Sequence, residues 1–60
     1  MTKEEWIINI ENTAAEAASI YGKDVMGKVL RKYGASTVAK LPSSNYEAVF
    51  GELFQMAADK

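Results

Sequence analysis

The side chains that could do chemistry in this 60-residue sequence are eight carboxylates and seven lysines or arginines, because the chain has no cysteine and no histidine. Without thiols or imidazoles it has no candidate for a Cys/His nucleophile pair, a zinc-thiolate site or a disulfide scaffold. A carboxylate can act as a general acid or base when it is held in a water-poor pocket. The acids here lie at expected helix starts and on polar helix faces, without the spacing of a calcium-binding loop. We therefore expect no catalytic residues, no metal site, no cofactor and no enzymatic activity.

The basic residues are concentrated in the middle of the chain. The net charge is +4 over residues 20–42, between −3 over residues 1–19 and −2 over residues 43–60. Lysines and arginines that share a surface can contact nucleic-acid phosphates. The alternative is a solvated helix face paired with acids of the flanking helices, and those acids weaken the long-range field. The candidate nucleic-acid contacts are Lys28, Arg31, Lys32 and Lys40.

Apolar residues outside the expected core are the third feature. Ile8 and Ile20 lie off the apolar stripe of the first expected helix, and Trp6 is a further candidate for partial exposure. Single exposed apolar residues are common in folded proteins. However, a domain of this length buries only about 60% of the surface of its unfolded chain, so a partner surface would add needed burial. We take Trp6, Ile8 and Ile20 as the candidate protein interface.

Helical periodicity accounts for the chain up to Gly34. A first helix is expected over residues 3–21, because Thr2 and Glu5 have the spacing of a capping box. Gly22 ends it, and Asp24 is expected to cap a second helix over residues 25–33. Gly34 should end that helix with a positive φ angle.

The remainder is expected to form a short helix and a longer one. Ser36 can cap a helical turn over residues 37–41, which Pro42 ends. Ser44 and Glu47 resemble a second capping box, which would open a last helix over residues 45–58. Its expected apolar face is Tyr46, Val49, Phe50, Leu53, Phe54, Met56 and Ala57, with Glu47, Gly51, Glu52 and Gln55 facing outward.

The fold class that follows is all-α: a compact three-helix bundle with a short helical turn between the second and last helix, as one domain over residues 1–60. No segment alternates with a period of two, and no apolar run reaches the roughly 20 residues of a membrane span. We expect a cytoplasmic protein without membrane contact. The expected core centre is Ile10, Ala14, Ala17, Val29, Leu30, Leu41, Val49, Phe50 and Leu53, surrounded by Trp6, Tyr21, Tyr33 and Phe54.

This phase of the last helix predicts the effects of two substitutions. Phe50→Ala should cost about 3–5 kcal/mol because it empties the core. Glu52→Ala, on the opposite face, should stay within about 0.5 kcal/mol.

Residues 29–53, VLRKYGASTVAKLPSSNYEAVFGEL, resemble a pattern found in small proteins and C-terminal segments of bacteriophage and prophage origin. In that pattern, Leu-x-Lys-Tyr-Gly-Ala/Val precedes a short turn, a Pro/Ser-rich cap and a Tyr-containing helix. Similar segments are appended to phage recombination and single-strand-DNA proteins. The resemblance implies a helical module in which the matching residues are structural. They are Leu30, Lys32, Tyr33, Gly34, Leu41 and Tyr46, while Val38 replaces the usual Leu.

These patterns predict a small non-catalytic interaction module of phage or mobile-element type that binds a protein partner. A second copy of the chain, forming a homodimer, is the first candidate partner. Weak nucleic-acid binding by the basic segment 23–40 is the alternative. A helix-turn-helix is not favoured, because Pro42 ends the short helix before it is long enough for the major groove.

Overall fold

The first helix begins at its predicted capping box. In the computed structural model, which describes residues 1–59, α1 spans Lys3–Tyr21. The Glu5 N–H donates to Thr2 Oγ1 at 3.2 Å, and the Thr2 N–H donates to Glu5 Oε1 at 2.9 Å. These hydrogen bonds hold the pKa of Glu5 below its ordinary value, with the Thr2 backbone N–H as the main cause.

A single residue separates α1 from α2, which spans Lys23–Lys32. Gly22 has a φ of 95° and serves as both the last cap of α1 and the first cap of α2. This backbone conformation is accessible mainly to glycine, so the chain reverses within one residue. The predicted cap at Asp24 was therefore wrong: α2 begins before Asp24, which lies in its first turn and there complements the helix dipole.

The second helix ends before Gly34, which has the positive φ angle that the sequence predicts. Gly34 has a φ of 82°. The Gly34 N–H donates to the Arg31 carbonyl and the Ala35 N–H donates to the Leu30 carbonyl, both at 3.0 Å. This pair of bonds is a Schellman motif, which satisfies carbonyls that the helix end would otherwise leave unpaired. Tyr33 is the C-cap rather than the last helical residue.

Two short 3₁₀ helices, η1 (Val38–Lys40) and η2 (Ser43–Asn45), lead into α3 (Tyr46–Ala58). The segment before Pro42 is shorter than predicted, and Leu41 is extended, as expected for a residue before proline. The second capping box does not form, because Ser44 lies inside η2. Asn45 precedes α3 and donates from Nδ2 to the Tyr33 carbonyl at 3.1 Å, which ties this turn to the end of α2.

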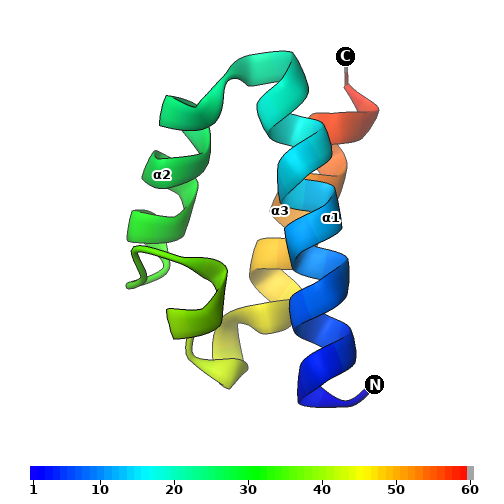
Figure 1. Ribbon diagram of the computed structural model, residues 1–60, viewed down its shortest axis with the longest axis vertical. Coiled ribbons are helices and arrows are strands. Elements are labelled where there is room, and N and C mark those ends of the chain that lie inside the picture. The colour runs from blue at the N-terminus through cyan, green and yellow to red at the C-terminus, as the bar shows by residue number, and fades with distance from the viewer. Residues whose placement is uncertain (60) are drawn as a thin grey trace.

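The three α-helices form the predicted bundle, with α1 and α3 parallel and α2 antiparallel to both (Figure 1). Trp6 near the start of α1 lies beside Tyr46 at the start of α3. At the other end, the Tyr21 hydroxyl donates to the Asp59 carbonyl at 3.2 Å. In Figure 1, α2 lies on one side of the α1/α3 pair, and no helix formed by residues 1–59 covers the opposite side. Within residues 1–59, no helix is long and apolar enough to cross a membrane.

The core lies between α1, α2 and α3 and is close to the prediction. Ile10, Val49 and Leu53 are the largest fully buried side chains. Two predictions were wrong at its edge: Phe54 is 59% exposed and Tyr21 is 41% exposed. Ala14 and Phe50 are only half-buried. Buried residues that the sequence did not place at the centre are Met26, Ala35, Tyr46 and Ala57.

Tyr46 is a core residue whose buried hydroxyl group can be removed to test its effect on stability. Its side chain is 3% exposed, and its hydroxyl has no hydrogen-bond partner among residues 1–59. Because an unpaired buried hydroxyl is unfavourable, Tyr46→Phe should leave the free energy of unfolding unchanged or raise it by up to about 1 kcal/mol. Urea unfolding followed by circular dichroism measures this. Tyr33→Phe, which removes a hydrogen-bonded hydroxyl, is the matched control and should lower the free energy of unfolding. Equal losses of stability in both variants would contradict the conclusion that the Tyr46 hydroxyl is unpaired.

Candidate functional site

An open groove runs between α1 and α3 on the side away from α2. We call it the α1/α3 groove; its volume is about 420 Å³. The α3 wall is apolar and the α1 wall is polar. The groove is lined by Asn9, Asn12, Thr13, Glu16, Phe50, Phe54, Ala57 and Ala58.

A row of aromatic rings leads from the core to this groove. The ring of Trp6 lies edge-on to Phe50, with centroids 5.9 Å apart. Phe50 in turn lies 6.0 Å from Phe54. Trp6 and Phe50 are half-buried, whereas Phe54 is exposed. The buried rings therefore hold an exposed ring in place on a rigid helix, so little conformational freedom remains to be lost on binding.

The α1 wall has polar groups of two kinds. The Thr13 hydroxyl donates to the Asn9 carbonyl within the helix at 2.8 Å, so it is already satisfied. Glu16 is exposed and forms no ion pair within residues 1–59. The groove thus combines an apolar wall with a carboxylate, on the other wall, that has no ion-pair partner among residues 1–59.

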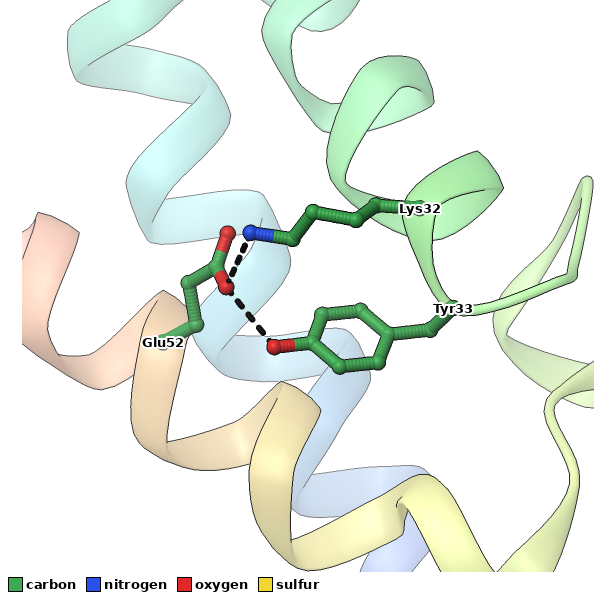
Figure 2. Close-up of polar contacts among 3 residues, drawn as sticks. All are labelled: Lys32, Tyr33 and Glu52. Atoms are coloured by element: carbon green, nitrogen blue, oxygen red, sulfur yellow. Dashed lines mark hydrogen bonds and ion pairs between the residues drawn. The ribbon is translucent and has the colours of Figure 1, made fainter.

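A second polar cluster lies on the opposite side of α3. Figure 2 shows Lys32 and Tyr33 reaching the same carboxylate oxygen of Glu52. Lys32 Nζ is 2.6 Å from Glu52 Oε1, and the Tyr33 hydroxyl donates to that oxygen at 2.8 Å. Glu52 was predicted to face solvent; instead, it is only 27% exposed and joins α3 to the end of α2.

These contacts shift the pKa values of all three groups. The hydrogen bond from Lys32, aided by that from Tyr33, lowers the pKa of Glu52 below its ordinary 4.5. The same contact with Glu52 raises the pKa of Lys32 above 10.5 and that of Tyr33 above 10.0. Hydrogen bonding to the Glu52 carboxylate is therefore the main cause of the shifts, and the cluster connects α2 to α3 as a structural contact.

The pH dependence of stability tests this contact. Because the folded-state pKa of Glu52 lies below 4.5, its contribution is present above pH 4.5 and is lost as the pH falls through the folded value. The raised pKa values of Lys32 and Tyr33 mean that their contributions are lost only as the pH rises above 10. Glu52→Gln should therefore cost about 1 kcal/mol at neutral pH.

Urea unfolding of wild type and Glu52→Gln across the acid range measures this difference. The two proteins should converge in stability at acidic pH, where the wild-type carboxylate is protonated. Glu11→Gln, which changes an exposed glutamate in the middle of α1 and away from both helix ends, is the control and should behave as wild type throughout. If Glu52→Gln lowers the free energy of unfolding by the same amount at every pH, the ionised Glu52 carboxylate is not the source of the stabilisation.

The predicted basic residues lie on or beside two elements, α2 and η1, and one of them is ion-paired. Lys28 and Arg31 are exposed on α2, and the Arg31 guanidinium lies against Gly27. Lys32 is turned toward α3 by Glu52, with its Nζ 5.3 Å from the centre of the Tyr33 ring. Lys40 is exposed on η1, a different element. Lys28 and Arg31 thus lie on one helix, whereas the Lys32 ammonium group is paired with Glu52.

The predicted apolar interface residues are also dispersed. Ile8 is 55% exposed and Ile20 is 37% exposed, but they are about 18 Å apart along α1. Trp6 packs against the core and contacts Phe50 from behind. Sequence reasoning missed Phe54 as a surface residue. The sequence feature that could have indicated its exposure is the breadth of the apolar face of the last helix. The seven apolar residues of that face cover more of the helix circumference than one core can bury.

Within residues 1–59, no three acidic side chains are grouped closely enough to hold a metal ion. The carboxylates with shifted pKa values, Glu5 and Glu52, are both engaged in structural contacts. Comparison with known proteins finds no matching family model, no similar curated protein and no similar solved structure.

Proposed function

We propose that this protein is a small non-catalytic interaction module that binds a partner protein through the α1/α3 groove. The observation that carries the proposal is Phe54, a large aromatic side chain that is 59% exposed and braced by Phe50. Exposed aromatic anchors beside an apolar pocket are typical of binding hot spots. The resemblance of residues 29–53 to phage and prophage segments supports an origin in a phage or mobile element.

The direction of the pKa shifts supports a non-catalytic role. A general acid needs a carboxylate whose pKa is raised toward neutrality. The pKa values of Glu5 and Glu52 are lowered instead, by contacts that cap α1 and join α2 to α3. The absence of cysteine suits a reducing compartment, and we place the protein in the cytoplasm.

Site-specific photo-crosslinking in the source cells tests the proposal. A benzoyl-phenylalanine at position 54 places the reactive group in the groove, whereas the same residue at position 8 is equally exposed on α1 but outside the groove. We expect a discrete crosslinked product from position 54 and none from position 8. Loss of the product from position 54, or the same product from both positions, would contradict the proposal. A product of twice the chain mass would identify a second copy.

Weak nucleic-acid binding by α2 is the second candidate. It is favoured by Lys28 and Arg31, which are both exposed, three residues apart on one helix and outside any ion pair within residues 1–59. Phosphate contacts release counterions, so the affinity should fall steeply with salt. A titration of labelled single- and double-stranded DNA at low salt measures it. Charge reversal of Lys28 and Arg31 should abolish binding; unchanged binding would refute this candidate.

A further inference from the structure

The groove and the ion-paired cluster lie on opposite sides of α3. Phe54 and Glu52 are two residues apart, which is about 200° around a helix. Glu52 faces the end of α2, so Phe54 faces away from α2, on the flank of α3 that borders the α1 wall of the groove. The groove is therefore an unpartnered face of the α1/α3 pair, and its charge indicates what could cover it.

Three acidic residues lie in or beside this face, and within residues 1–59 no lysine or arginine lines it. Glu16 lines the groove. Glu5 lies three turns before Glu16 on the same side of α1, and Glu47 lies two turns before Phe54 on the same side of α3. Within residues 1–59, the basic side chain of α1 is that of Lys3, outside the groove, and α3 has none. The face therefore presents the aromatic side chain of Phe54 with negatively charged glutamates at its edges.

A second copy of the chain fits this face poorly. A two-fold symmetric dimer would place the acidic rim of one copy against the same rim of the other, since such an interface pairs a surface with itself. The basic helix α2 of a second copy would match the charge. However, the apolar side chains of α2, Met26, Val29 and Leu30, are buried in their own core, so α2 has no anchor to offer Phe54.

The length of the groove sets the size of its occupant. Its α1 wall runs from Asn9 to Glu16, which is about 10 Å or two helical turns. An amphipathic helix laid into such a groove uses apolar anchors three or four residues apart.

We infer that the α1/α3 groove binds a cationic amphipathic helix of a partner protein, with apolar side chains against Phe50 and Phe54 and lysines or arginines toward Glu16 and Glu47. The inference rests on the proposed function and adds the chemical class of the partner. The apolar contacts supply most of the affinity, and the charges select the partner and accelerate its association.

A peptide titration tests the inference, with Trp6 as the reporter because it is the single tryptophan and its ring contacts Phe50. The probe is an amphipathic peptide of about 15 leucines and lysines. One control peptide has glutamate in place of lysine, and the other has the same leucines and lysines in an order that is not amphipathic. We expect the cationic amphipathic peptide to bind most tightly and its affinity to fall as salt rises.

Matched variants locate the contact. Phe54→Ser should weaken binding about tenfold, whereas Ile8→Ser, at a similarly exposed position of α1 that does not line the groove, should have a much smaller effect. Glu16→Lys should weaken binding about fivefold, whereas Glu11→Lys, exposed but outside the groove, should change it much less. All four positions are exposed or outside the core, so circular dichroism should confirm that each variant folds.

The outcomes separate this inference from the proposed function. If the acidic peptide binds more tightly than the cationic one and Phe54→Ser weakens its binding, the inference of a cationic partner is overturned, while the groove remains a docking site. A Phe54-dependent dimer in sedimentation would name a second copy as the occupant and overturn the inference. Peptide binding that is insensitive to Phe54→Ser, or no binding by any peptide, would overturn the inference, and crosslinking from position 54 would then decide the proposed function independently.

Discussion

Replacing Leu53 with alanine is expected to lower the free energy of unfolding by about 3–4 kcal/mol. Leu53 is fully buried, and it belongs to the same cluster as Ile10 and Val49. Truncation removes the transfer free energy of the side chain and leaves a cavity that the neighbouring helices can close only in part. A 60-residue domain has a total stability of about 3–9 kcal/mol, so the variant should be close to unfolding. Urea unfolding followed by circular dichroism measures the loss.

The neighbouring residue provides the control. Phe54 is larger than Leu53 but 59% exposed, so Phe54→Ala should cost less than about 1 kcal/mol. Phe50 is half-buried between Trp6 and Phe54, so the loss expected for Phe50→Ala falls to about 1–2 kcal/mol, below the value predicted from the sequence. Equal losses for Leu53→Ala and Phe54→Ala would show that α3 is rotated about its axis and that Phe54 is not a surface anchor.

Replacing Gly34 with valine is expected to destabilise the protein by about 1–2 kcal/mol. The cause is conformational, because a Cβ at Gly34 would meet no atom within 4 Å, whereas its φ of 82° is unfavourable for a β-branched residue. The Schellman bonds from Gly34 to Arg31 and from Ala35 to Leu30 depend on this conformation. Their loss would also shift Tyr33, which holds Glu52.

Gly51 is a matched control with the opposite expected sign. It also has open space around its Cβ position, but it lies inside α3 with ordinary helical geometry. Gly51→Ala should therefore raise the free energy of unfolding by up to about 1 kcal/mol. If Gly34→Val is neutral in the same urea experiment, the end assigned to α2 is wrong.

The sequence predicts the parts of the fold that short-range signals determine. Thr2 and Glu5 are three residues apart, and together with Gly22 they fix both ends of α1. Gly34 ends α2 for a reason visible in the sequence, since few other residues tolerate its φ. The helical periodicity then identifies most of the core, including Ile10 and Leu53.

The candidate site was harder to predict because it depends on the rotation of α3. The apolar face of α3 is too broad for one core, and local sequence does not say which edge is left exposed. Burial of Val49 and Leu53 sets that rotation and leaves Phe54 outside, while Glu52 on the opposite flank meets Lys32 and Tyr33, nineteen or twenty residues away in the chain. Ser44 failed as a cap for a similar reason, since η2 occupies its position and Asn45 bonds to Tyr33 instead.

Amide correlation NMR spectra of the protein, recorded with and without the cationic amphipathic peptide, test most directly whether the α1/α3 groove is the contact surface. We expect the largest shift changes within residues 9–16 of α1 and 50–58 of α3, the segments that contain the groove-lining residues, together with the indole N–H of Trp6. The amides of Lys28, Arg31 and Lys40 should remain unchanged. Shift changes centred on Lys28, Arg31 and Lys40 or around Ile8, with the amides of the groove-lining residues unaffected, would contradict binding in the α1/α3 groove.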